Sequence, residues 1–374
     1  MDHKDLIATN ILEDLGSYPA TPFFESGPAE YVKRTLNRLS IPYVRDSFGN
    51  IIGHHQDSRC KTPAIAFVAH MDHPGFEVIE TSTHGLIAKA SGGVPAAAIA
   101  KTIPVLILSP DGKRIPAFTT PHPESAAPDD RRGERLVFVH PGAKIDLPIP
   151  SPVVFDLPDF VLEGNLVRMR AVDDLAGCAA ILASLDQLVK SKTAVNVYGI
   201  FTRAEEIGLY GARLLAEANT LPTETIIVSI ESSPVIPGVV QGAGPIIRTG
   251  DAAYTFSATA EQILSSACDS LQQSLGKFKS QRQLMSGGVC EATAFAAFGY
   301  TVTGLAFPLG NYHNATTHFA DLNGDVAAEY IQLSDYLAGV RLITEAASVK
   351  PKEPSLLSHK TPQDIRSRLE SSSS

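Results

Sequence analysis

The sequence predicts a mixed α/β fold, in which helices flank a mostly parallel sheet and a small β-barrel domain is inserted into the chain. Continuous apolar runs of strand length are typical of strands that are buried on both faces of a parallel sheet; they cover residues 64–69, 194–201, 225–230 and 301–307. Helical patterns of apolar residues separate these runs. Between residues 78 and 164, short alternating segments divided by Gly, Pro and Asp indicate a separate β domain.

The remaining elements follow from the same patterns. Apolar stripes predict two helices within residues 5–40, and a turn at Phe48-Gly-Asn predicts a hairpin over residues 42–55. Further helices are predicted from Asp174 onward, over residues 207–218 and over residues 326–347. We therefore expect a catalytic domain of residues 1–77 and 165–349, an inserted β domain of residues 78–164, and a mobile tail of residues 350–374.

Composition and charge exclude several classes of protein. The 374 residues carry a formal net charge of -9, whereas nucleic-acid-binding proteins usually present a basic face, so we expect no nucleic-acid partner. No apolar run approaches the ~20 residues that span a bilayer, and the first residues lack the features of a signal peptide, so we expect no membrane partner. Four cysteines without paired spacing favour a reducing cytoplasm over disulfides.

Histidines and carboxylates at the ends of apolar runs are the main functional signal. In open α/β sheets, sites form outside the carboxyl ends of the strands, so residues that follow different strands can converge there. Four of five such segments follow an apolar run, and together they contain His70, Asp173, Glu205, Glu206, Glu231 and His313. We expect these residues to meet at one edge of the sheet.

Each segment also has an ordinary structural explanation. For His70 and Asp72, this explanation is a structural histidine beside a capping residue. The functional alternative is that the Asp72 carboxylate accepts the second ring N–H of His70 and fixes its tautomer. The pair Asp173-Asp174 is explained as a helix N-cap, or as one residue that caps while the other bridges two metal ions.

Glu205 and Glu206 repel each other, so a pair placed directly after a buried strand requires cations or a shared proton. The functional interpretation is that one glutamate binds a metal and the other takes a proton from the attacking water. The alternative is a pair of solvated glutamates at the start of a helix.

In combination, these segments supply two histidines and three carboxylates as ligands. This set is typical of a dinuclear site for zinc, cobalt or manganese, because a structural zinc site would use thiolates. The sequence therefore predicts two divalent metal ions per chain, with zinc as the first choice.

The order of these segments and their local amino-acid sequences resemble those of the deblocking and glutamyl aminopeptidase family of the zinc-dependent aminopeptidase/carboxypeptidase clan. The resemblance extends over residues 25–347 and includes residues 152–156, 208–212 and 244–251. It implies a zinc-peptidase fold with an inserted β-barrel domain. It further implies one metal on His70 and Glu231, a second on Glu206 and His313, a bridging Asp173, and Glu205 as the general base. We expect Asp72, as the partner of His70, to support catalysis.

The chain departs from the family pattern around the expected pocket. His73 stands where the family usually has Glu, and Glu231 stands where Asp is commoner. A loop that ends in Cys290-Glu291 replaces the usual Gly-Gly-Thr-Asp, and the last histidine lies in a different local setting. These changes leave the hydrolytic residues in place and concern substrate specificity. We expect substrate contacts from His73, Arg248, Glu291 and His318.

We interpret the chain as a dinuclear aminopeptidase that removes N-terminal residues from short peptides. One alternative keeps the site but changes the substrate, as in a carboxypeptidase or an N-acyl amino acid deacylase. Another is a metal-free binding or scaffold protein, although every ligand position is filled. The resemblance also implies a homo-oligomer, because the family often forms hollow assemblies and this chain keeps the inserted domain.

The last metal ligand is either His313 or His318. Both follow the same apolar run, so placement alone does not decide between them. His313 lies close to the strand end, whereas His318 lies beyond a longer polar loop that would fix it less well. The family pattern also has its histidine soon after a Pro and a Tyr. We predict that His313 binds the metal; the alternative exchanges the two roles.

Overall fold

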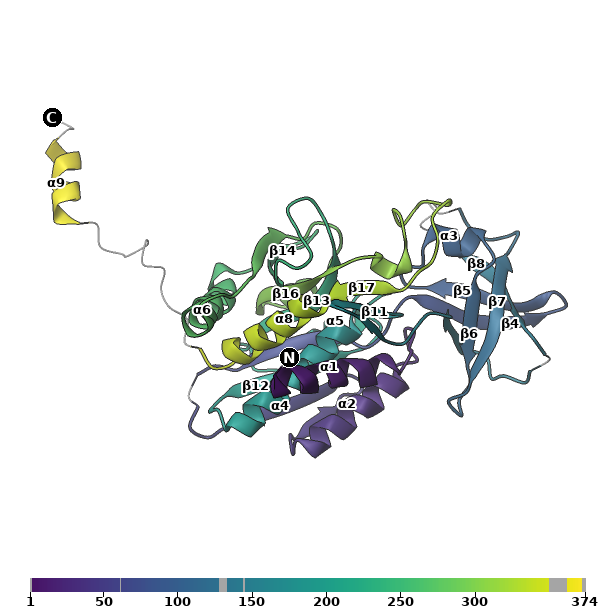
Figure 1. The fold of residues 1–374 in the computed structure, drawn as a ribbon, viewed down its shortest axis with the longest axis horizontal. Coiled ribbons are helices and arrows are strands. Elements are labelled where there is room, and N and C mark those ends of the chain that lie inside the picture. The colour runs from purple at the N-terminus through teal and green to yellow at the C-terminus, as the bar shows by residue number, and fades with distance from the viewer. Residues whose placement is uncertain (1, 61, 128–132, 144, 350–361, 372–374) are drawn as a thin grey trace.

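An eight-stranded mixed sheet forms the centre of the larger domain (Figure 1). The computed structural model describes residues 2–60, 62–127, 133–143, 145–349 and 362–371. The strand order is β1 (Tyr43–Arg45), β2 (Ile51–Gln56), β12 (Asn196–Thr202), β3 (Ile65–His70), β13 (Ile226–Pro234), β16 (Thr301–Leu309), β14 (Ile246–Gly250) and β15 (Gln281–Leu284). The four central strands β12, β3, β13 and β16 are parallel, so their carboxyl ends lie at one edge. This arrangement confirms the predicted fold class.

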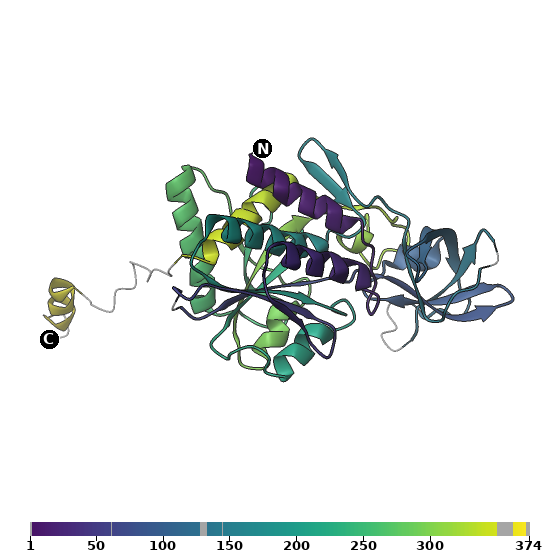
Figure 2. The same cartoon turned by 90° about the horizontal axis from the view of Figure 1, so that it is seen from below.

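Helices cover both faces of this sheet (Figure 2). One hydrophobic core lies between the sheet and α1 (His3–Gly16), α2 (Ser26–Arg38), α4 (Leu175–Ser191), α6 (Ala258–Leu275) and α8 (Leu333–Ala346). A second core lies under α5 (Tyr210–Glu217) and α7 (Glu291–Ala296) on the opposite face. Burial on both faces explains why the central strands are apolar along most of their length.

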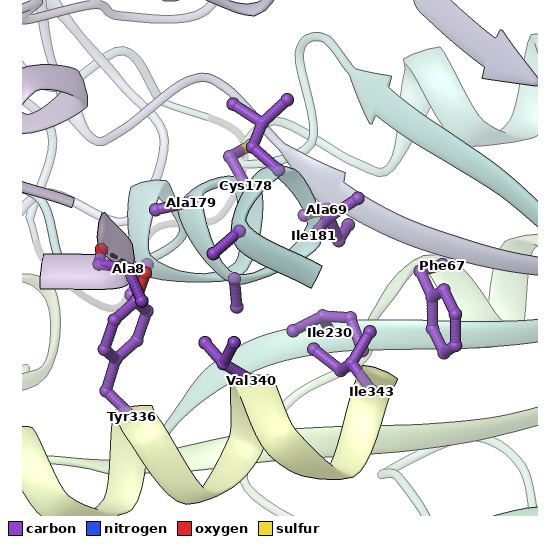
Figure 3. Packing of buried hydrophobic residues seen from close by; sticks show 14 of the residues in the cluster. Ala8, Phe67, Ala69, Cys178, Ala179, Ile181, Ile230, Tyr336, Val340 and Ile343 are labelled. Carbon is purple, nitrogen blue, oxygen red and sulfur yellow. Dashed lines mark hydrogen bonds between the residues drawn. The ribbon is translucent and has the colours of Figure 1, made fainter. Parts of the chain in front are cut away.

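The helix α4 is the most deeply buried of these helices. It packs against α1 and α8 as well as the sheet, and Figure 3 shows its residues Cys178, Ala179 and Ile181 inside this core. The hydroxyl of Tyr336 on α8 donates a hydrogen bond to the carbonyl of Ala8 on α1, at 3.0 Å, and joins the helices around α4. The helix α4, which follows the candidate ligand Asp173, is therefore packed between α1, α8 and the sheet.

The inserted domain is a closed six-stranded barrel with its own core. Its strands run in the order β4 (Gly75–Ser82), β5 (Gly85–Ser91), β8 (Leu136–Pro141), β7 (Arg114–Pro121), β6 (Pro104–Leu108) and β9 (Ser151–Phe155), and a short helix α3 (Ala96–Ala100) lies beside them. The barrel that the sequence predicted is thus confirmed. The next strand, β10 (Val161–Glu163), falls within the predicted insertion but pairs with β11 (Leu166–Met169) and β17 (Glu329–Gln332) in a separate three-stranded sheet.

The helix predicted over residues 326–347 was wrong at its start. It begins at Leu333, because residues Glu329–Gln332 form the strand β17 beside β11. Burial alternates along β17, which is the pattern of a strand with one covered face. Of the predicted tail, residues 350–361 and 372–374 lie outside the described residues, and α9 (Gln363–Ser371) is exposed along its length. Within the described part of the chain, no helix has both the length and the apolar character to span a membrane.

Candidate metal centre

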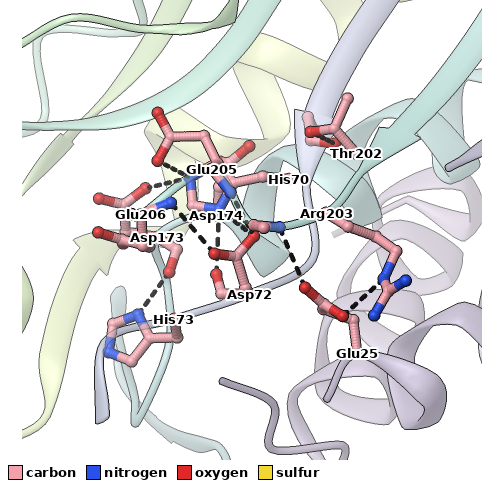
Figure 4. Close-up of polar contacts among 12 residues, drawn as sticks. Glu25, His70, Asp72, His73, Asp173, Asp174, Thr202, Arg203, Glu205 and Glu206 are labelled. Atoms are coloured by element: carbon pink, nitrogen blue, oxygen red, sulfur yellow. Dashed lines mark hydrogen bonds and ion pairs between the residues drawn. The ribbon is translucent and has the colours of Figure 1, made fainter. Parts of the chain in front are cut away.

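Acidic and imidazole side chains converge beside the carboxyl ends of the central parallel strands (Figure 4). His70 ends β3, Glu205 and Glu206 follow β12, and Glu231 lies in the second half of β13. Asp173 precedes α4, and His313 lies in the short 3-10 turn η1 (Tyr312–Asn314) after β16. Three groups of these residues each offer ligand atoms within 4.8 Å of one another: His70, Asp173 and Glu231; Asp173, Glu206 and His313; and His70, Glu205 and Glu206.

The carboxylate of Asp173 lies between the two histidines. Its Oδ1 is 3.4 Å from Nε2 of His70, and its Oδ2 is 3.7 Å from Nε2 of His313. Glu206 approaches the second histidine from the other side, with Oε2 at 3.4 Å from Nε2 of His313. One carboxylate therefore presents its two oxygens to two separate groups of candidate ligands, which is the arrangement that a bridging ligand requires.

Backbone carbonyls fix the orientation of both imidazoles. Nδ1 of His70 lies 3.0 Å from the carbonyl oxygen of Asp72, and Nδ1 of His313 lies 3.1 Å from that of Gly93. Because a carbonyl can only accept, Nδ1 carries the proton in each case and Nε2 is left to face the carboxylates. A side chain at position 93 has no room, since an added Cβ would lie 2.1 Å from Nδ1 of His313.

The turn that holds His313 has an unusual backbone. Asn311, His313 and Asn314 all have positive φ angles, of 52°, 53° and 64°. Asparagine tolerates this left-handed conformation better than most residues, whereas for histidine it is less common. In this turn, the imidazole of His313 reaches Asp173 and Glu206.

The carboxylate of Asp72 has a different partner from the one expected. It lies 3.8 Å from Nδ1 of His70, whose proton goes to the backbone carbonyl instead. Both carboxylate oxygens accept backbone N–H groups, at 3.0 Å from Glu205 and 3.1 Å from Glu206. Asp72 therefore positions the glutamate pair, because the two adjacent N–H groups match the two oxygens of one carboxylate better than a single imidazole does.

Asp174 caps the helix α4. Its side chain accepts the backbone N–H of Gly177 at 3.1 Å, as an N-cap residue does. Only Asp173 of this pair points into the cluster of candidate ligands. The structure thus divides the two residues between a cap and a candidate ligand.

Burial favours the protonated form of the carboxyl groups in this cluster in the absence of cations. Burial raises the pKa of Asp173 to about 6, and burial together with neighbouring carboxylates raises the pKa of Glu205 and Glu206 well above the usual value. Burial lowers the pKa of His70, but Glu205 and Asp173 outweigh it and the net pKa is raised. Burial lowers the pKa of His313 to about 3, so this imidazole is neutral.

Two buried oxygens of the candidate ligands have no hydrogen-bond partner in the described part of the chain, Oδ1 of Asp173 and Oε1 of Glu206, and the same holds for Oδ2 of the capping residue Asp174. Buried polar atoms are almost always satisfied, so such atoms indicate a missing partner. Carboxylate oxygens and neutral imidazole nitrogens are suitable ligands for zinc and similar divalent ions. The residues present therefore fit two divalent cations.

A cavity of about 280 Å³ opens beside this cluster. The candidate ligands form one wall, and residues such as Met285, Gly288 and Tyr312 form another. Arg248 also lines the cavity, although only 3% of its surface is exposed, and its Nε has no hydrogen-bond partner among the described residues. Arg248 thus lies where a contact with substrate was expected.

The other three expected substrate contacts lie elsewhere. His73 is buried behind Asp173, with its ring nitrogens 2.6 Å from the carbonyl of Asp173 and 2.9 Å from Oδ1 of Asn314. Glu291 is buried beneath the cluster and accepts hydrogen bonds from the hydroxyls of Thr202 and Ser229. His318 is exposed on a loop. None of the three lines the cavity.

Glu329 is a site residue that the sequence interpretation missed. It is fully buried and accepts backbone N–H groups on both sides of the cluster. Glu329 follows two alanines in a stretch that was assigned to a helix, so no motif marked it. A strand pattern over residues 329–332 is the one signal that could have indicated a buried acid there.

Comparison with known proteins identifies the family. The family model described as M42 glutamyl aminopeptidase matches residues 49–326, and the chain belongs to this family. The family consists of dinuclear metallopeptidases of the aminopeptidase/carboxypeptidase clan, so the resemblance seen in the sequence is confirmed.

Curated relatives match over shorter stretches. SgcX of Escherichia coli (strain K12), named as a candidate aminopeptidase, is 24% identical over 197 residues, which cover 50% of this chain and 53% of SgcX. A protein of Acetivibrio thermocellus with the same kind of name is 35% identical over 100 residues, which cover 25% of this chain and 29% of that protein. The chain thus spans about half or less of the length of these relatives.

Solved structures match over nearly the whole chain. An aminopeptidase from the archaeon Desulfurococcus kamchatkensis has a TM-score of 0.74 at 20% identity, with 94% of this chain and 96% of that chain covered. The TET1 peptidase of Pyrococcus horikoshii has a TM-score of 0.73 at 22% identity, with 91% and 99% covered. At these identities the likeness establishes the shared fold.

Replacing the two competing histidines should separate their roles. We expect His313→Ala to lower bound metal toward one ion per chain, because His313 faces both Asp173 and Glu206. His318→Ala should keep the wild-type metal content, because this exposed side chain lies outside the cluster. Elemental analysis of the purified, metal-loaded variants measures this directly, and the reverse pattern would show that His318 is the ligand.

Metal binding should weaken as the pH falls. Asp173, with its pKa raised to about 6, holds a proton below that pH, and a cation must displace it. The apparent affinity should therefore fall by about tenfold per pH unit for each displaced proton as the pH drops below 6, and level off above the pKa values of the ligands. Competition with a chromophoric chelator between pH 5 and 8 tests this, and a pH-independent affinity would contradict it.

Proposed function

We propose that this protein is a two-metal aminopeptidase that removes N-terminal residues from short peptides. The observation that carries the proposal is the position of Asp173, whose two carboxylate oxygens face two different histidines beside a cavity. Membership of the M42 glutamyl aminopeptidase family supports the same reaction class.

The proposed ligands follow the grouping of the side chains. His70 and Glu231 hold one ion, Glu206 and His313 hold the other, and Asp173 bridges them. The convergence of their ligand atoms within 4.8 Å supports this assignment. The two ions are divalent, and we propose zinc, with cobalt or manganese as substitutes, because the donor set combines imidazoles with carboxylates.

Two divalent cations at this position would polarise the scissile carbonyl and lower the pKa of water. The remaining chemistry falls to residues of the chain. Glu205 takes a proton from the attacking water and returns it to the leaving amine. Its side chain is 12% exposed and lines the cavity, which gives its carboxylate access to both partners. Asp72 holds the backbone of Glu205 and so fixes where the base can act.

The cavity supports small substrates. Its volume of about 280 Å³ lies near the lower end of the range for ligand pockets, about 300–1,000 Å³, so the end of a peptide fits better than a folded chain. We propose that Arg248 contacts the substrate from the cavity wall, where its unpaired Nε is free to donate a hydrogen bond.

We further propose a homo-oligomer in a reducing cytoplasm. The Pyrococcus horikoshii TET1 peptidase is described as assembling into a tetrahedron or a large octahedral shell, and this chain has the same fold with its barrel. Four free cysteines, two of them buried, support a reducing compartment.

A substrate panel tests the reaction. Aminoacyl-p-nitroanilides with a free amine should be cleaved in the presence of zinc, cobalt or manganese, and their N-acylated counterparts should not. Glu205→Gln should keep both metals and lose activity by about 10²–10⁴-fold, because the amide cannot accept the proton. Faster cleavage of the N-acylated compounds would favour a deacylase, and full activity of Glu205→Gln would remove Glu205 from the mechanism.

The proposed homo-oligomer is tested by its mass in solution. Light scattering on size-exclusion fractions at micromolar concentration should give a mass that is a multiple of the 39.8 kDa chain. A mass equal to one chain would refute the homo-oligomer without affecting the proposed reaction.

A further inference from the structure

One buried carboxylate joins the two chain segments that carry Asp173 and His313. Oε2 of Glu329 accepts the backbone N–H of Val172 at 2.8 Å and that of Asp173 at 2.9 Å. Oε1 accepts the backbone N–H of His313 at 2.8 Å. Glu329 itself has no exposed surface and does not line the cavity.

These three hydrogen bonds link segments that the covalent chain does not hold together. Asp173 and His313 come from distant parts of the sequence, and residues 315–328 form a loop between His313 and the strand β17 that contains Glu329. Without the carboxylate, three buried N–H groups would lack a partner, which is costly. The carboxylate thus connects the backbone of one candidate ligand directly to the backbone of the other.

The link also accounts for the strained turn. His313 has a positive φ of 53°, a conformation that persists only where the surroundings determine it. The hydrogen bond from its N–H to Glu329 fixes the peptide plane before His313, and the carbonyl of Gly93 fixes its ring. Backbone and side chain are therefore held by separate partners.

We propose that Glu329 is a positioning residue that sets the separation between Asp173 and His313, and thereby the geometry of the second metal site. The proposal rests on the proposed two-metal function. It assigns Glu329 no contact with substrate or metal; the residue acts through the two backbone segments that it joins.

The chemistry of a carboxylate suits this role. Three N–H donors need acceptor oxygens on both sides of the group, and a carboxylate offers two. Glu329→Gln keeps the size of the side chain but has one acceptor oxygen, so its NH₂ group must face a backbone N–H. The variant therefore breaks the link on one side and leaves the volume unchanged.

Asp335 provides a matched control. It is also a buried carboxylate that accepts two backbone N–H groups, at 2.7 Å from Gly242 and 2.9 Å from Gly244. Neither glycine carries or adjoins a candidate ligand. Asp335→Asn removes the same kind of interaction and reports the effect of lost buried hydrogen bonds alone.

The experiment measures metal binding in wild type, Glu329→Gln and Asp335→Asn. Glu329→Gln should lose about 10–100-fold in affinity for one of two ions, as is usual when a partner that orients a ligand is removed. Its cobalt-loaded form should show an altered visible absorption spectrum, and its kcat should fall with little change in KM. Asp335→Asn should match wild type in affinity, spectrum and kcat.

The outcomes separate the two proposals. A wild type that binds fewer than two ions overturns the two-metal function itself. A wild type with two ions and a Glu329→Gln variant with the same affinities and spectrum overturns the role of Glu329 alone, as does an equal loss in both variants. If Glu329→Gln does not fold, hydrogen exchange in the metal-free wild type decides. The amides of Val172, Asp173 and His313 should exchange slowly, and fast exchange would overturn the proposal.

Discussion

The compensation of buried negative charge is the constraint on which the site depends. Moving an ionised carboxylate out of water costs several kcal/mol or more unless donors or cations surround it. Asp72 and Glu329 meet this requirement with backbone N–H groups on both carboxylate oxygens, so each holds a chain segment in place at the site. Asp173 and Glu206 each keep one oxygen without a donor. For Asp173 this oxygen, Oδ1, faces Nε2 of His70, whereas Glu206 faces Nε2 of His313 with its other oxygen, Oε2.

This division explains why the acids of the site have different tasks. An acid that is saturated by backbone N–H groups holds the chain in place and has no capacity left for a metal. An acid with an oxygen that lacks a donor must gain a cation or keep a proton, and Asp173 and Glu206 are in this position. The positioning acids and the candidate ligands are thus the same residue types, separated by the number of backbone donors in reach.

The sequence predicted those features that depend on local pattern. The buried strands were evident because burial on both faces makes a run apolar, and His70 and Glu205 were evident because they follow such runs. The partner of Asp72 was not predictable, because it depends on which N–H groups β12 brings beside β3. Glu329 was missed for the same reason, since its three donors come from segments that only the tertiary fold brings together. His73 adjoins Asp72 in the sequence, but its side chain is buried behind Asp173, and the side chain of Glu291 contacts Thr202 and Ser229 beneath the cluster.

The contact between Gly93 and His313 makes the catalytic domain depend on the inserted barrel. Gly93 follows β5 and belongs to the barrel segment, yet its carbonyl holds the imidazole of His313 in the catalytic domain. The barrel is reinforced in this position by Lys101, which donates to the carbonyls of Asn323 and Gly324 in the loop after His313. Excision of the barrel would remove the acceptor that fixes the tautomer of this ring. The insertion is therefore no removable accessory: the larger domain, although it has its own core, is chemically incomplete without it.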